Sequence, residues 1–139
     1  MKNKYLIVLF SLGLIVTACK KKDNVPSVSV DVYLNLQLPQ YINLQTPLNW
    51  IYYSGAGNRG LIIYRISPSD FCILERTCTF DPEKSSAQVQ VLSDNFSCID
   101  STCNSKFSIS DGSILNGPAN QNLLQYNYDF DGVNLHIHN

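Results

Sequence analysis

The stretch Val28-Ser-Val-Asp-Val-Tyr-Leu-Asn-Leu-Gln-Leu38 carries an aliphatic residue at every second position. In an extended chain, side chains two positions apart lie on the same face, so these aliphatic side chains share one face. This period is typical of a β-strand with one buried side. Pro39 is expected to end the strand, because proline has no amide hydrogen to donate to a sheet.

The rest of the chain continues as short apolar stretches separated by Gly, Pro, Asn and Asp, and Asp131-Gly132 is typical of a hairpin turn. No segment has a convincing apolar repeat of 3.6 residues. The expected strands are residues 48–53, 61–66, 71–76, 87–92, 96–99, 106–109, 123–130 and 133–138. We therefore predict one all-β domain over residues 28–139, a small antiparallel sandwich or barrel.

The beginning of the chain has the pattern of a bacterial lipoprotein export signal. Lys2 and Lys4 precede an apolar run, residues 5–16, that is too short to span a membrane comfortably. The run leads into Val-Thr-Ala-Cys19, which resembles the lipobox in which small residues precede a lipid-bearing cysteine. We expect residues 1–18 to be a cleaved signal peptide and Cys19 to carry the lipid.

Residues 19–27 contain three consecutive lysines and are expected to form a flexible tether between the lipid and the domain. The predicted location is the bacterial cell envelope, as an outer-membrane lipoprotein, and the membrane is the expected partner. The chain has ten Lys/Arg against eleven Asp/Glu, and no basic face is evident. This charge balance excludes nucleic acid as a partner.

Four cysteines remain in the domain: Cys72, Cys78, Cys98 and Cys103. An even number of cysteines in an exported domain predicts disulfides, with three possible pairings. The same four thiolates could instead bind zinc or a [2Fe–2S] cluster. Thiol exchange is less favoured, because the sequence has no Cys-x-x-Cys.

Five short motifs from Arg76 onward follow the order of motifs in a known domain: residues 76–79 (RTCT), 104–107 (NSKF), 111–113 (DGS), 117–119 (GPA) and 123–126 (LLQY). They resemble the start of the first cluster loop, the second cluster loop, the glycine turn, the Gly-Pro-Ala loop and the returning strand of the Rieske iron–sulfur domain. The resemblance implies a Rieske-like β-fold in which two loops are apposed.

The ligand positions depart from this family, which uses Cys-x-His and Cys-x-x-His to supply two thiolates and two imidazoles. Cys78 holds the first cysteine position, but Phe80 stands at the first histidine position. Asp100 and Cys103 fall at the second cysteine and second histidine positions. One ligand of four cannot hold a Rieske cluster, so the resemblance implies the fold, no cofactor and no electron transfer.

In the family both loops converge on the metal, so the resemblance implies that Cys78 and Cys103 face each other and could form a disulfide instead. Closing a loop of about 25 residues would stabilise the fold by roughly 3 kcal/mol. If their strands pair, Cys72 and Cys98 could form a second bridge. The alternative pairing is Cys78 with Cys98, which leaves Cys103 free.

His136 and His138 are the only histidines, and on a strand they would share one face, where they could bind a metal together. We interpret them instead as part of an exposed last strand. No nucleophile elbow or other hydrolase pattern is present, so we do not expect an enzyme. The expected function is that of a binding or structural module that docks to another envelope protein; the alternative is an electron carrier with a cysteine-bound metal.

Overall fold

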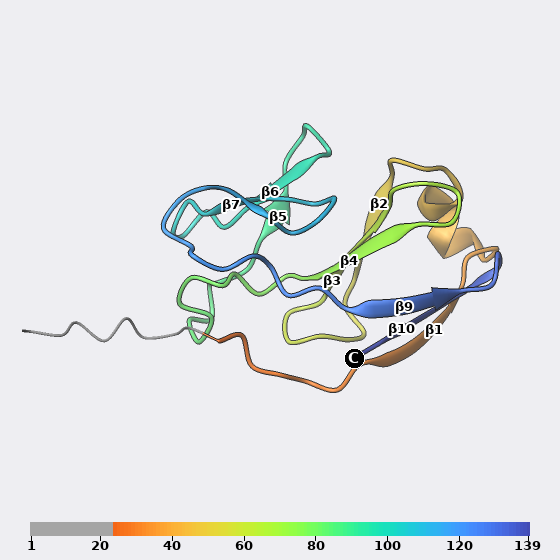
Figure 1. The fold of residues 1–139 in the computed structure, drawn as a ribbon, viewed down its shortest axis with the longest axis horizontal. Helices are drawn as coiled ribbons and strands as arrows, with labels where there is room; N and C mark the ends of the chain where they lie inside the picture. The colour runs from red at the N-terminus through yellow and green to blue at the C-terminus, as the bar shows by residue number, and fades with distance from the viewer. Residues whose placement is uncertain (1–23) are drawn as a thin grey trace, which may run out of the picture.

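The computed structural model describes residues 24–139, so the signal peptide, Cys19 and most of the tether lie outside the described residues. Within this range the chain forms ten strands in three antiparallel sheets and one short 3₁₀ helix (Figure 1). The predicted all-β antiparallel fold is therefore confirmed, although the sheets do not close into a barrel. None of the helical structure in residues 24–139 has the length and apolar character needed to cross a membrane.

The terminal sheet joins the first described strand to the last. It consists of β1 (Asp31–Asn35), β10 (Asn134–His138) and β9 (Asn127–Phe130), in that order. Leu34 lies opposite Leu135 and Val32 opposite Ile137, so the aliphatic face predicted from the alternation packs on a core. The strand is shorter than predicted, because the chain leaves the sheet after Asn35 and Leu38 is exposed.

The middle sheet consists of β2 (Trp50–Tyr53), β3 (Leu61–Arg65) and β4 (Phe71–Glu75). Strands β3 and β4 are buried on both faces, which explains their uninterrupted apolar sequences. One set of alternating residues packs toward the terminal sheet: Leu61, Ile63, Phe71 and Ile73. The other set packs into a second core on the opposite face: Ile62, Tyr64, Cys72 and Leu74.

The loop sheet covers that second core and consists of β5 (Gln90–Val91), β6 (Ser97–Ile99), β7 (Lys106–Ser108) and β8 (Ile114–Asn116). Its central side chain, Phe107, is completely buried beside Cys98 of the paired strand. In Figure 1 the loop sheet and the terminal sheet lie on opposite sides of the middle sheet. The fold thus places two cores on the two faces of one sheet.

Two elements of the structure were not predicted. The 3₁₀ helix η1 (Pro39–Gln45) begins at the proline that ends the strand region, and its seven residues are too few to show a helical period. Strand β8 has only three residues, none of them buried, and therefore leaves little apolar pattern in the sequence. The predicted strand 123–130 is regular only from Asn127, although Gln125 forms an isolated bridge with Leu74.

Candidate functional site

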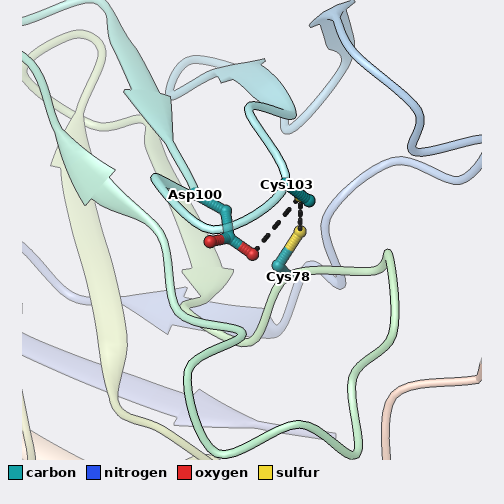
Figure 2. Close-up of side chains that lie close together, drawn as sticks. All are labelled: Cys78, Asp100 and Cys103. Carbon is teal, nitrogen blue, oxygen red and sulfur yellow. Dashed lines mark hydrogen bonds between the residues drawn. The ribbon is translucent and has the colours of Figure 1, made fainter.

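Two loops meet at one end of the loop sheet. The first loop, residues 76–89, connects β4 to β5, and the second loop, residues 100–105, connects β6 to β7. The Sγ atoms of Cys78 and Cys103 lie 3.7 Å apart across the gap between the loops. Figure 2 shows the carboxylate of Asp100 beside them, with Oδ2 accepting a 3.4 Å hydrogen bond from the Cys103 thiol.

The second loop is a tight turn organised by Asp100. Its backbone amide donates to the carbonyl of Ser105 at 3.0 Å, and its carbonyl accepts from the amide of Asn104 at 2.7 Å. Oδ1 of Asp100 accepts from the Thr102 amide at 2.8 Å. Asn104 has φ 62°, a left-handed conformation that asparagine adopts more readily than most residues. The turn therefore holds Oδ2 of Asp100 toward the Cys103 sulfur.

The Gly117-Pro118-Ala119 segment packs directly against the second loop. The Ala119 amide donates a 3.1 Å hydrogen bond to Oγ of Ser105, whose oxygen also lies 3.1 Å from the Cys103 sulfur. Gly117 has φ 102°, and a Cβ atom there would lie 2.5 Å from the Cα of Ser105. Only glycine allows this approach, so the segment packs tightly on the backbone of the second loop beside Cys103.

The first loop is held by Arg59, which sequence reasoning missed. Its guanidinium donates to the carbonyls of Ser85 at 2.9 Å, Lys84 at 2.6 Å and Pro82 at 3.2 Å. The Cys78 amide completes the arrangement by donating to the carbonyl of Ala87 at 3.1 Å. Arginine suits this role, because its planar group presents several donors in fixed directions. In the sequence, a single arginine in a glycine-rich turn gives little indication that it holds a distant loop.

Glu75 is a second residue that sequence reasoning missed, and its side chain is completely buried at the end of β4. Its carboxylate accepts hydrogen bonds from the amides of Asn58 and Arg59, at 2.7 and 2.9 Å. It also accepts from both the amide and the hydroxyl of Thr77, at 2.9 and 2.8 Å. The sequence carries only a weak signal of this role, a single glutamate directly after an uninterrupted apolar stretch. A buried glutamate needs hydrogen-bond partners, and these come from turns that the sequence alone does not bring together.

Burial controls the chemistry of the thiols. It raises the pKa of Cys78 well above the usual value, and the neighbouring Asp100 and Cys103 act in the same direction against an opposing hydrogen bond from the Phe80 backbone. Burial likewise raises the pKa of Cys72 and of Cys98 to about 12. These three thiols are therefore protonated at neutral pH, which makes them poor nucleophiles.

Cys103 is only partly buried and lines a small pocket of about 130 Å³. Phe80 and Pro118 give this pocket apolar walls, while Lys84 lines it with its ammonium 2.5 Å from the Asp81 carboxylate. Phe80 packs against the core at the position where the resemblance would require a histidine ligand. The pocket gives solvent a route to Cys103, whereas Cys78 is completely buried.

Potential ligand atoms of Cys78, Asp100 and Cys103 lie within 4.8 Å of one another. Among residues 24–139, neither Cys72 nor Cys98 belongs to such a group of three or more. This donor set does not fit a Rieske cluster, because the two loops offer no imidazole, nor does it fit a site made of four thiolates. His136 and His138 lie in the terminal sheet.

Cys72 and Cys98 share one core, but not one sheet. Strand β4 pairs with β3, whereas β6 pairs with β5 and β7, so the strand pairing assumed for a second disulfide does not occur. The two cysteines instead belong to sheets that pack on the same core. All four cysteines of the described chain are free thiols in the structure. The sulfurs of Cys78 and Cys103 lie 3.7 Å apart, and the Cys72 thiol lies near enough to Cys98 to help raise its pKa.

Comparison of the sequence with models of protein families finds no match, and a comparison with curated proteins finds none either. What the site can do therefore has to follow from its own donors, burial and geometry.

Proposed function

We propose that the chain is a bacterial cell-envelope lipoprotein whose β-domain serves as a structural or binding module, with its two loops joined by a disulfide between Cys78 and Cys103. The observation that carries this proposal is the 3.7 Å separation of the two sulfurs. A disulfide has an S–S length of about 2.05 Å, so the sulfurs would need to approach by roughly 1.7 Å. The partly exposed Cys103 side chain belongs to a short loop and can supply this movement.

A Rieske-like domain without its cluster is supported by the positions of the loops. Cys78 and Cys103 come from the two segments that resemble the family's cluster loops, and their sulfurs meet. Gly117 and Ala119, from the Gly-Pro-Ala segment, contact the second loop, as the resemblance would require. The donor set of two sulfurs and one carboxylate is the reason for proposing a covalent link in place of the iron.

An electron carrier with a cysteine-bound metal is the weaker alternative. Cys72 and Cys98 lie outside the group formed by Cys78, Asp100 and Cys103, so three donors remain instead of four. A thiolate at Cys78 would also be disfavoured by burial and by the adjacent carboxylate. Thiol exchange meets the same objection, because it needs a cysteine that ionises readily.

Cys19 and most of the tether lie outside the described residues, so the lipid anchor and the envelope location remain predictions from the sequence. A domain anchored in this way works through its surface, and another envelope protein is the proposed partner. The export route also supplies the oxidising compartment in which a disulfide forms.

The test is to produce the full-length chain in an exporting bacterium and map its cysteines without reduction. Cleavage after Arg76 and Lys84, combined with cleavage before Asp100, places Cys72, Cys78, Cys98 and Cys103 in four different peptides. We expect labelled palmitate on the chain, a Cys78–Cys103 linked peptide pair, and no iron or zinc bound by the four cysteines. Free thiols with a metal bound by the cysteines would establish the alternative, and a Cys78–Cys98 peptide pair would overturn the proposed bridge.

Two matched variants separate the parts of this proposal. Cys19→Ser removes the thiol that accepts the lipid, so palmitate labelling should disappear while the Cys78–Cys103 peptide pair remains. Cys103→Ser should abolish that peptide pair while leaving palmitate labelling intact. Persistent labelling of the Cys19→Ser variant would refute the anchor.

A further inference from the structure

A second group of chemically active side chains lies on the terminal sheet, away from the two loops. Leu135 and Ile137 of β10 point into the core, so His136 and His138 lie on the opposite, outer face. Strand β9 places Asp129 opposite His136, and strand β1 places Asp31 opposite His138. Three strands thus bring two imidazoles and two carboxylates together on one rigid surface.

The carboxylate of Asp129 lies between the two imidazoles. Its Oδ2 atom is 3.2 Å from Nε2 of His138 and 3.7 Å from Nδ1 of His136. Ligands at about 2.0–2.1 Å from a tetrahedral zinc ion are separated by roughly 3.3 Å. Two of the three edges of a tetrahedral face therefore already have nearly the required length, and ligand atoms of the three residues lie within 4.8 Å of one another.

The carboxylate of Asp31 contacts the ring nitrogen of His136 that does not face Asp129. Its Oδ1 atom lies 2.7 Å from Nε2 of His136, where it can accept a hydrogen bond from that ring nitrogen. This bond favours the tautomer in which Nδ1 keeps a lone pair, and Nδ1 faces Asp129. A carboxylate behind a ligating imidazole is the usual arrangement at protein zinc sites. Tyr33 stacks on the same ring, with centroids 3.9 Å apart and planes inclined by 4°, which further fixes its orientation.

We propose that the outer face of the terminal sheet binds a divalent transition-metal ion of the zinc class through Nδ1 of His136, Nε2 of His138 and Oδ2 of Asp129. Imidazole donors select zinc, copper and nickel over magnesium and calcium, which prefer oxygen ligands. Asp31 positions His136 without itself binding the ion, and one coordination position stays open to water. The sequence had placed both histidines on a plain exposed strand, because it did not show that Asp31 and Asp129 flank them.

The test uses the full-length chain purified in detergent and carrying Cys103→Ser, which removes a donor from the group in the two loops. Zinc chloride is titrated by calorimetry while the imidazole ¹⁵N resonances are followed. We expect one ion per chain, with shifts at Nδ1 of His136 and Nε2 of His138. Zinc should also raise the melting temperature of this protein.

Variants in the same background distinguish ligands from neighbours. His138→Gln and Asp129→Asn should lose stoichiometric zinc binding, and Asp31→Asn should weaken it by roughly tenfold to a hundredfold. Asp70→Asn, in the exposed β3–β4 turn, is the matched carboxylate control and should bind zinc normally. Imidazole resonances that do not respond to zinc, or an unchanged affinity in His138→Gln, would show that these contacts are only histidine–aspartate ion pairs.

Discussion

The hydroxyl of Tyr126 donates a 3.0 Å hydrogen bond to Oε2 of Glu75, and both side chains are buried. Glu75 ends β4, while Tyr126 immediately precedes β9 of the terminal sheet. Through the same carboxylate, the turn at Asn58 and the beginning of the first loop are joined to these strands. One buried acidic side chain therefore connects the middle sheet, the terminal sheet and the loop that carries Cys78.

Tyr126→Phe should destabilise the domain, because it removes a hydrogen bond to a buried charged group without changing the size of the ring. Such bonds contribute about 1.5–3 kcal/mol, and the free energy of unfolding in urea should fall by this amount. Tyr33→Phe is the matched control, since Tyr33 is exposed and should change the stability by less than about 0.5 kcal/mol. Equal losses of stability in the two variants would contradict a stabilising role of the Tyr126–Glu75 hydrogen bond.

Reduction should destabilise the native protein by about 3 kcal/mol if Cys78 and Cys103 are joined, because the unfolded chain regains the freedom of the closed loop. The measurement compares urea unfolding with and without dithiothreitol. Cys103→Ser should remove the effect of the reductant, whereas Cys98→Ala should retain it. The reverse result would favour the Cys78–Cys98 pairing.

Free thiols at Cys72 and Cys98 would make stability fall in alkaline solution. Burial raises the pKa of each thiol from the usual 9.0 to about 12, so the unfolded chain loses these protons first. The stabilising contribution is complete below pH 9 and disappears as the pH rises toward 12, at about 1.4 kcal/mol per pH unit for each thiol. Unfolding free energies measured from pH 8 to 10 should begin to fall toward this slope, and Cys98→Ala should reduce the fall. A slope that emerges only after reduction would reveal a bridged pair instead.

Gly117→Ala should destabilise the protein more than Gly132→Ala. The two glycines have nearly the same positive φ, 102° and 98°, so alanine meets a conformational cost of about 1–2 kcal/mol at both. A Cβ atom at position 117 would also collide with the backbone of Ser105, whereas at position 132 it meets nothing within 4 Å. Thermal unfolding of both variants measures the difference, and similar melting temperatures would show that the second loop yields easily.

The strands were predictable wherever side-chain burial leaves a simple pattern. Alternation over the first strand and continuous apolar runs in β3 and β4 both follow from which faces are covered. Helix η1 and strand β8 were missed, because neither is long enough to establish a period. The arrangement of the strands into three sheets depends on long-range pairing, which no local pattern encodes.

The candidate site was only partly predictable. The resemblance indicated that Cys78 and Cys103 would meet, and their sulfurs do lie close together. It did not indicate Arg59 or Glu75, because their roles depend on turns that come close to the first loop only in the folded chain. The histidines show the same limit, since the partners that give them a possible function belong to two other strands.

Because β3 and β4 are apolar on both faces, sliding one past the other by a single residue would exchange one aliphatic surface for another of similar polarity. A strand with one solvent-exposed face resists such a slip, because the slip would bury the polar side chains of that face. Here the charged residues at the strand ends add to the resistance that comes from the hydrogen-bonded turn at residues 66–70. Arg65 donates hydrogen bonds to the carbonyls of Leu44 and Ser67. A slip would also break the hydrogen bond that the Glu75 carboxylate accepts from the Asn58 amide. The alignment of these two apolar strands is therefore held by Arg65 at the end of β3 and by Glu75 at the end of β4, together with the turn that joins the strands.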